Sequence, residues 1–121
     1  MADETTPSAL KFEDVAGVCV VGFRDASILD ALTIQRIGKE LYDLVEAQAK
    51  KKVVLDFGDV RFLSSQALGV LLTLRKKADK EKATICLARI RPELARVFKI
   101  TQLDQLFKFH DSRDHAIASL T

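Results

Sequence analysis

Short apolar runs alternate with amphipathic segments along most of this chain, and this alternation constrains its fold more than any other feature. Val18–Phe23, Val53–Phe57 and Ala83–Ala88 are apolar stretches of strand length. Between the first two, Ile34–Val45 carries apolar residues at the three- and four-residue spacing of a helix. Strands that alternate with helices predict a largely parallel α/β sheet built from right-handed crossovers.

Two further strands complete the expected sheet. Leu10–Asp14 is joined to Val18–Phe23 by a short link near Ala16-Gly17, which predicts a hairpin with an antiparallel edge. Leu106–Phe109 is predicted to be a short fifth strand. The predicted order is β-β-α-β-α-β-α-β-α. The helices are expected to follow Asp30, to run from about Ser65 to Asp79, to begin at Pro92, and to be capped by Asp111 or Ser112.

The chain of 121 residues is long enough for one domain with its own hydrophobic core. Residues 1–8 are polar and are expected to form a flexible tail, so that 9–121 form the domain. The tail lacks the basic and apolar regions of a secretory signal, so we expect a cytoplasmic protein. A net charge of +2 and the absence of a long apolar run give no reason to expect direct contact with nucleic acid or insertion into a membrane.

The sequence contains little that would support catalysis, and we expect no enzymatic activity. Its five glycines form none of the usual phosphate-binding loops. His110 and His115 do not have the spacing of a helical ligand pair, so we expect neither a metal nor another cofactor. Cys19 and Cys86 lie in separate apolar runs without CxxC spacing, and we expect both to be buried thiols.

Asp56 ends a central apolar strand, where a carboxylate is also typical of the phosphoacceptor of receiver domains. Those domains have an acidic pair after the first strand and a lysine after the last, around a magnesium ion. Here the first strand leads into a hairpin, and Lys108 lies within the predicted last strand. We therefore expect Asp56 to be a strand-end residue that pairs with backbone amides.

Two adjacent hydroxyls, Ser64 and Ser65, lie where a strongly apolar helix is predicted to begin. Serine is a common cap at this position. The start of a helix also has unpaired N–H groups and the positive end of the macrodipole, so it favours a phosphate. The pattern of residues leaves both interpretations open.

The stretch Phe62–Val70 resembles the signature of the STAS domain family, which includes bacterial anti-sigma-factor antagonists and the cytoplasmic tails of sulphate transporters. Leu29-Asp30 and Leu103–Ala118 resemble further parts of the family pattern. The resemblance thus covers nearly all of the chain after residue 8. It implies a single STAS-like domain with a mostly parallel sheet, an N-terminal hairpin and about four helices.

This resemblance implies a regulatory binding protein. In antagonists of this type, a partner that is both anti-sigma factor and serine kinase, with a histidine-kinase fold, phosphorylates the hydroxyl that matches Ser65. The unphosphorylated antagonist binds this partner and frees the sigma factor, and a phosphatase can reset the switch. Ser65 is therefore the candidate phosphoacceptor, ahead of Ser64. The candidate partner-binding residues are Asp30, Asp59, Arg61, Phe62, Leu63, Ser64, Ser65 and Gln66.

The chain departs from the family pattern at the serine doublet. Phosphorylated antagonists most often have Asp-Ser-Ser-Gly, whereas Ser64-Ser65-Gln66-Ala67 lacks both the aspartate and the glycine. The alternative function is a scaffold subunit of a stress-signalling assembly or of a lipid or anion transporter. In that case the two serines would only cap the helix.

Overall fold

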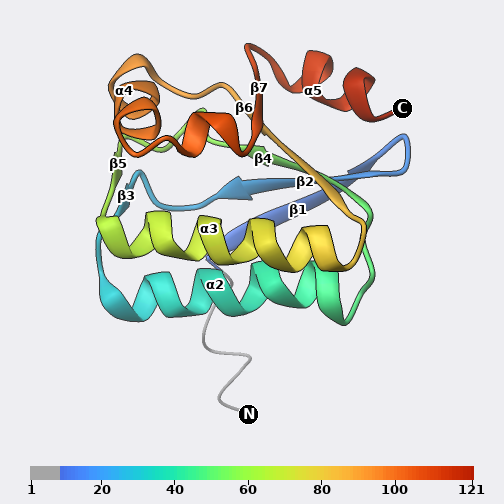
Figure 1. Ribbon diagram of the computed structural model, residues 1–121, viewed down its shortest axis with the longest axis horizontal. Helices are drawn as coiled ribbons and strands as arrows, with labels where there is room; N and C mark the ends of the chain where they lie inside the picture. The colour runs from blue at the N-terminus through green and yellow to red at the C-terminus, as the bar shows by residue number, and fades with distance from the viewer. Residues whose placement is uncertain (1–8) are drawn as a thin grey trace.

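A five-stranded sheet forms the centre of the computed structural model, which describes residues 9–121. The strand order is β1-β2-β4-β6-β7 (Figure 1). The first two strands are antiparallel and the others pair in parallel, so the predicted sheet with its N-terminal hairpin is confirmed. The expected tail, residues 1–8, lies outside the described residues. The strand bounds are Leu10–Val15 for β1, Val18–Phe23 for β2, Lys52–Asp56 for β4, Thr84–Ala88 for β6 and Lys108–His110 for β7.

Four helices of residues 9–121 cover the two faces of this sheet. Helices α2 (Ala31–Glu46) and α3 (Ser65–Lys80) lie side by side on one face, as Figure 1 shows. Helix α4 (Pro92–Ile100) contributes to the same core, whereas α5 (Arg113–Leu120) packs on the opposite face. Among the helices of residues 9–121, none is both long enough and apolar enough to cross a membrane.

The alternation of side chains along the central strands builds two hydrophobic cores. Val53 and Leu55 of β4 belong to the larger core under α2, α3 and α4, and Val54 belongs to the smaller one under α5. All three are at most 1% exposed. The three central residues of the strand are therefore all apolar because both of its faces are covered.

The structure corrects the sequence prediction in two places. Two short strands, β3 (Ser27–Ile28) and β5 (Phe62–Leu63), pair in parallel as a separate sheet. Two-residue strands are too short to show a hydrophobic period, so no pattern in the sequence indicated them. The last strand begins at Lys108 instead of Leu106, because a 3₁₀ turn over Leu103–Gln105 precedes it and Leu106 still donates to that turn.

Several local predictions are confirmed. Pro92 begins α4, and Ser112 caps α5 through its Oγ, which accepts from the His115 N–H at 3.1 Å. Cys19 and Cys86 are buried free thiols, and burial raises the pKa of Cys19.

Candidate functional site

Ser64 is the cap of α3, and its hydroxyl is committed to the fold. Its backbone is extended, with φ −85° and ψ 166°, and its Oγ accepts from the Ala67 N–H at 3.2 Å. Its own N–H donates to the Ile28 carbonyl oxygen at 3.1 Å, which ties the helix start to β3. The sequence left open which serine would cap the helix, and the geometry assigns this role to Ser64.

Ser65 is the first residue of α3 and is exposed to solvent. Within residues 9–121, its hydroxyl has no hydrogen-bond partner. No acidic side chain lies in the first turn of α3, so the partial positive charge of the helix start is not offset locally. The position therefore presents a free hydroxyl in an environment that favours an anion.

Asp30 also performs a capping role. Its Oδ2 accepts from the Thr33 N–H at 2.9 Å and from the Thr33 hydroxyl at 3.0 Å, at the start of α2. The hydrogen bond from the Thr33 backbone is the main reason why the pKa of Asp30 is lowered. Asp30 is exposed, so its carboxylate caps the helix and still faces solvent.

The small β3–β5 sheet brings most of the predicted partner-binding residues to one end of the molecule. Phe62 and Leu63 pair with Ser27 and Ile28, which places the start of α2 beside the start of α3. Gln66 instead lines a groove between α2 and α3. Asp59 lies near Arg89, and its negative charge helps to raise the pKa of Arg89. Asp30, Asp59, Arg61, Phe62, Ser65 and Gln66 are exposed, and Leu63 and Ser64 are half-buried.

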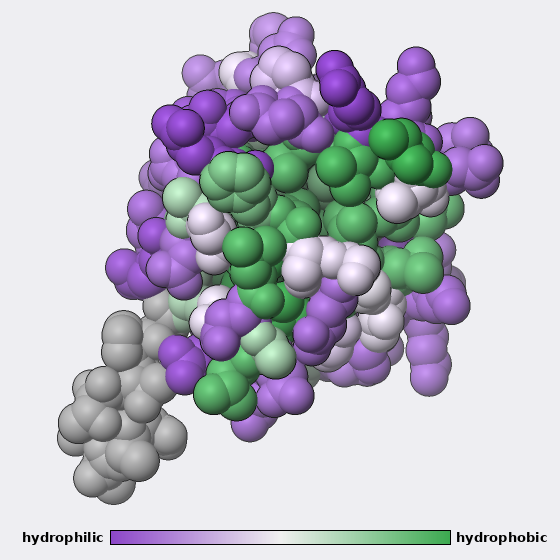
Figure 2. Space-filling view, turned by 90° about the vertical axis from the view of Figure 1, so that its left-hand side faces the viewer, coloured by the Kyte–Doolittle hydropathy of each residue, from purple (hydrophilic) through white to green (hydrophobic). Residues whose placement is uncertain are grey.

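An exposed apolar surface covers this end of the molecule. Leu29 is 56% exposed, Leu32 is 70% exposed and Phe62 is 56% exposed, and we call these three residues the apolar patch. Figure 2 shows hydrophobic side chains spread across this side. The sequence analysis singled out Phe62 but missed the two leucines. Their signal was present, since both flank the Asp30 cap and lie outside the core-facing helical period.

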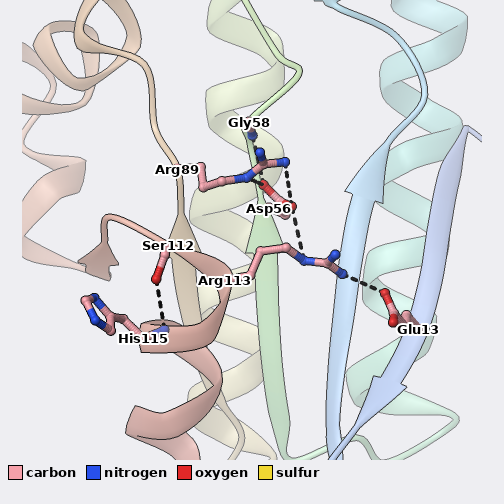
Figure 3. A network of polar contacts seen from close by, with 7 residues as sticks. All are labelled: Glu13, Asp56, Gly58, Arg89, Ser112, Arg113 and His115. Atoms are coloured by element: carbon pink, nitrogen blue, oxygen red, sulfur yellow. Dashed lines mark hydrogen bonds and ion pairs between the residues drawn. The ribbon is translucent and has the colours of Figure 1, made fainter.

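Asp56 holds the start of the loop that leads to Ser65 (Figure 3). It ends β4 and is 8% exposed, and its Oδ1 accepts from the Gly58 N–H at 2.9 Å. This contact with a backbone amide confirms the prediction for Asp56. Arg89 adds two hydrogen bonds to the same carboxylate, from Nε at 2.8 Å and from Nη2 at 3.0 Å.

Gly58 lies directly beneath the Arg89 guanidinium. A Cβ built on Gly58 would come within 2.2 Å of Arg89 Cζ, so any side chain at this position would displace the arginine. Arg89 itself has φ +57°, a left-handed conformation that is uncommon for arginine. The hydrogen bond to Asp56 raises the pKa of Arg89. The loop at Gly58 therefore has no room for a side chain while Arg89 stays bonded to Asp56.

Arg113 extends this network to the other face of the sheet, as Figure 3 shows. Its Nε lies 3.3 Å from Asp56 Oδ2, and its Nη2 donates to Glu13 Oε1 at 2.8 Å. The sequence analysis missed both arginines, because they reach Asp56 from distant segments. Lys108 lies within β7, as expected, and residues 9–121 contain no group of three or more potential metal-ligating side chains.

Comparison with known proteins places this sequence and fold in one family. The sequence model of the STAS domain matches residues 9–116. A STAS-domain containing protein of Pseudomonas aeruginosa is 39% identical over 70 residues, which cover 58% of this chain and 68% of the relative.

Two solved structures share the architecture. An anti-sigma factor antagonist from Mycobacterium paratuberculosis is 26% identical, with a TM-score of 0.79 over 94% of this chain and 96% of that one. The Bacillus cell fate determinant SpoIIAA in its phosphorylated form is 17% identical, with a TM-score of 0.73 over 93% of this chain and 100% of that one. The sequence match and the strand order together lead to one conclusion: this chain belongs to the STAS domain family.

Proposed function

We propose that this protein is an anti-sigma-factor antagonist that binds a serine kinase of histidine-kinase fold, and that phosphorylation of Ser65 releases this partner. One observation carries the proposal: Ser64 performs the capping role, which leaves the neighbouring Ser65 hydroxyl exposed and free of partners within residues 9–121. A kinase can therefore modify Ser65 without removing a contact that the fold needs.

The helix start should tolerate the added phosphate. A phosphoserine carries nearly two negative charges at neutral pH, and unpaired N–H groups with the positive end of the macrodipole favour it there. The first turn of α3 has no acidic residue that would repel it. The protein should therefore stay folded in both states.

The same charge should be unfavourable in a complex. Ser65 follows β5, whose Phe62 belongs to the apolar patch, so a partner that covers the patch also removes water from around Ser65. An unpaired dianion in such a contact costs several kcal/mol, and each ~1.4 kcal/mol is a tenfold loss in affinity. Release by phosphorylation then needs no change of fold.

The comparisons support this proposal at the level of the family. The Mycobacterium paratuberculosis structure is described as an anti-sigma factor antagonist, and SpoIIAA has been solved in a phosphorylated form. Cytoplasmic localisation and a resetting phosphatase belong to the same proposal. The competing function, a scaffold subunit that is never phosphorylated, predicts that charge at Ser65 has no effect on its complexes.

Incubation with candidate kinase partners and ATP, followed by phosphosite mapping by mass spectrometry, tests the modification. We expect phosphate on Ser65, none on a Ser65→Ala variant, and undiminished labelling of a Ser64→Ala variant. Calorimetry should show that Ser65→Asp weakens binding by about 100-fold, whereas the neutral Ser65→Asn binds within a few-fold of wild type. Equal affinity of the Asp and Asn variants would overturn the charge switch and favour the scaffold.

The apolar patch is tested separately from the phosphate. Phe62→Ala and Leu32→Ala should each weaken partner binding by about tenfold or more, because exposed apolar residues at an interface centre dominate its energy. Phe12→Ala is the matched control, since Phe12 is 47% exposed on β1, away from the β3–β5 sheet. If the Phe12 and Phe62 variants lose the same affinity, the patch is not the contact surface.

A further inference from the structure

The outer face of α3 carries a regular stripe of exposed residues. The buried residues of this helix belong to the larger core and are Ala67, Leu68, Leu71, Leu74 and Ala78. Four residues on the opposite side of the helix are exposed within the described part of the chain, and we call them the outer stripe: Ser65, Gly69, Leu72 and Lys76. Successive members are four, three and four residues apart, which is the spacing of a seam between two paired helices.

Gly69 has no role in the stripe that the fold of residues 9–121 explains. It lies inside α3, where glycine is less favourable than alanine because it loses more backbone freedom on folding. Its φ is not left-handed, and a Cβ built on it would meet no atom of this part of the chain within 4 Å. The missing side chain instead leaves space on the outer stripe, into which another helix can insert an apolar side chain.

The stripe itself contains an apolar side chain that fits this space. Leu72 follows Gly69 by three residues and is 37% exposed. Two α3 helices can pair antiparallel about a two-fold axis, with Leu72 of each copy over Gly69 of the other. The same axis then places Lys76 of each copy opposite Ser65 of the other, because both pairs of residues have the same midpoint in the sequence. One register therefore uses all four residues.

The charges in this register depend on the state of Ser65. Lys76 forms no ion pair within residues 9–121, whereas the basic residues on either side of it are both paired with acidic side chains. Opposite an unmodified Ser65, the Lys76 ammonium faces the positive end of the α3 macrodipole, which is unfavourable. Opposite a phosphoserine it faces nearly two negative charges, and a symmetric pair contains this contact twice. A phosphate therefore makes a repulsive contact attractive.

We propose that the protein phosphorylated at Ser65 forms a symmetric antiparallel dimer through the outer stripes of α3. The occupant is a second copy of this chain, because the stripe supplies both the space and the side chain that fills it, and both the modified serine and its counter-charge. The phosphorylation itself rests on the proposed function, whereas the pairing is a property of this protein alone. One helix from each copy makes a small contact, so the dimer is weak and concentration-dependent. It covers Ser65 and so shields the phosphate from a phosphatase.

Sedimentation equilibrium of the purified protein tests the charge dependence without any kinase. The probe is Ser65→Glu, which places a carboxylate at the same helix start. It should dimerise about tenfold more tightly than the neutral Ser65→Gln variant, because two ion pairs form. Adding Lys76→Glu to Ser65→Glu should abolish this gain. Adding Lys99→Glu, the matched control on α4, should preserve it, because Lys99 is exposed and lies outside the stripe. Equal association of the Ser65→Glu and Ser65→Gln variants, or equal effects of the two lysine variants, would overturn the proposal.

A larger residue at Gly69 tests the register. Gly69→Gln should weaken association of the Ser65→Glu variant by about tenfold or more, because the new side chain fills the space that Leu72 of the other copy needs. The same change should raise the stability of the monomer in urea denaturation, because glutamine is the better helix former, so unfolding would not explain the loss. Ala118→Gln is the matched control, since Ala118 is exposed on α5 at the opposite face of the sheet. If the Gly69 and Ala118 variants associate equally well, the register is wrong.

The outcomes separate this dimer from the proposed function. Absence of kinase labelling at Ser65 would refute the switch, whatever the Ser65→Glu variant does alone. A Ser65→Glu variant that stays monomeric would refute only the dimer, because binding and release of a kinase partner need no contact between two copies of this chain.

Discussion

Replacing Gly58 with alanine tests whether Arg89 holds the loop that leads to Ser65. The new Cβ would lie 2.2 Å from Arg89 Cζ, so the guanidinium must move away from Asp56. Gly58 does not have a left-handed φ, so alanine introduces no backbone strain of its own. The substitution therefore acts as a steric probe of one ion pair.

The expected cost follows from the contacts that are lost. Arg89 donates two hydrogen bonds to Asp56, and a hydrogen bond to a charged group contributes about 1.5 to 3 kcal/mol. The Arg89 side chain is 44% exposed, and Asp56 keeps the Gly58 N–H and the nearby Arg113. These two facts reduce the loss to about 2 kcal/mol. Alanine has a lower conformational entropy than glycine in the unfolded chain, which restores about 0.4 to 1 kcal/mol of stability. The net loss in the free energy of unfolding is therefore about 1 to 1.5 kcal/mol.

A double-mutant cycle measured by urea denaturation isolates this effect. In an Arg89→Ala background the Cβ has no guanidinium to displace, so Gly58→Ala should be neutral or stabilising by up to about 1 kcal/mol. The coupling free energy between the two positions should therefore be about 2 kcal/mol. If Gly58→Ala costs the same in both backgrounds, the methyl group acts on something other than Arg89 and the reasoning is refuted.

Two further predictions concern the helix caps. Ser64→Ala should lower the free energy of unfolding by about 1 kcal/mol because the Ala67 N–H loses its acceptor, whereas Ser65→Ala should change it by less than about 0.5 kcal/mol. Equal losses in urea denaturation would contradict this division of roles. Thr33 lowers the pKa of Asp30, so this cap stabilises the fold fully above the ordinary aspartate pKa and stops doing so as pH falls through the lowered folded value. The stability of wild type relative to Asp30→Asn should therefore fall between about pH 5 and about pH 2, and a constant difference would argue against it.

The main sheet could be predicted because its signals are local and repeated. Val53–Phe57 is a continuous apolar run, and Ile34–Val45 has a clear helical period. These patterns reflect burial, which the structure confirms on both faces of β4. The β3–β5 pair has no such signal, because each strand has two residues and gains its partner only when the loops approach each other.

The location of the candidate site could be predicted from the sequence, but the contacts that hold its loop in place could not. The doublet Ser64-Ser65 could be located from a cap pattern and a family resemblance, but only the geometry showed which hydroxyl forms the cap. The arginines on Asp56 are 33 and 57 residues from it along the chain, and nothing in one sequence links them. Contacts of this kind form only when distant segments of the chain come together in the fold, and no local sequence pattern indicates them.

The two supports of the loop suggest how a switch can operate without the usual family motif. Asp56 and Arg89 fix the start of the loop, and Ser64 fixes its end through the Ile28 carbonyl and the Ala67 N–H. Because both ends are held, a phosphate on Ser65 should change the charge of the surface more than its shape. The absence of the aspartate that the family pattern usually has before the serine also affects the charge of this surface. With Ser64 in its place, the unphosphorylated doublet is neutral, so the phosphate would be the first negative charge that the partner meets at these two residues.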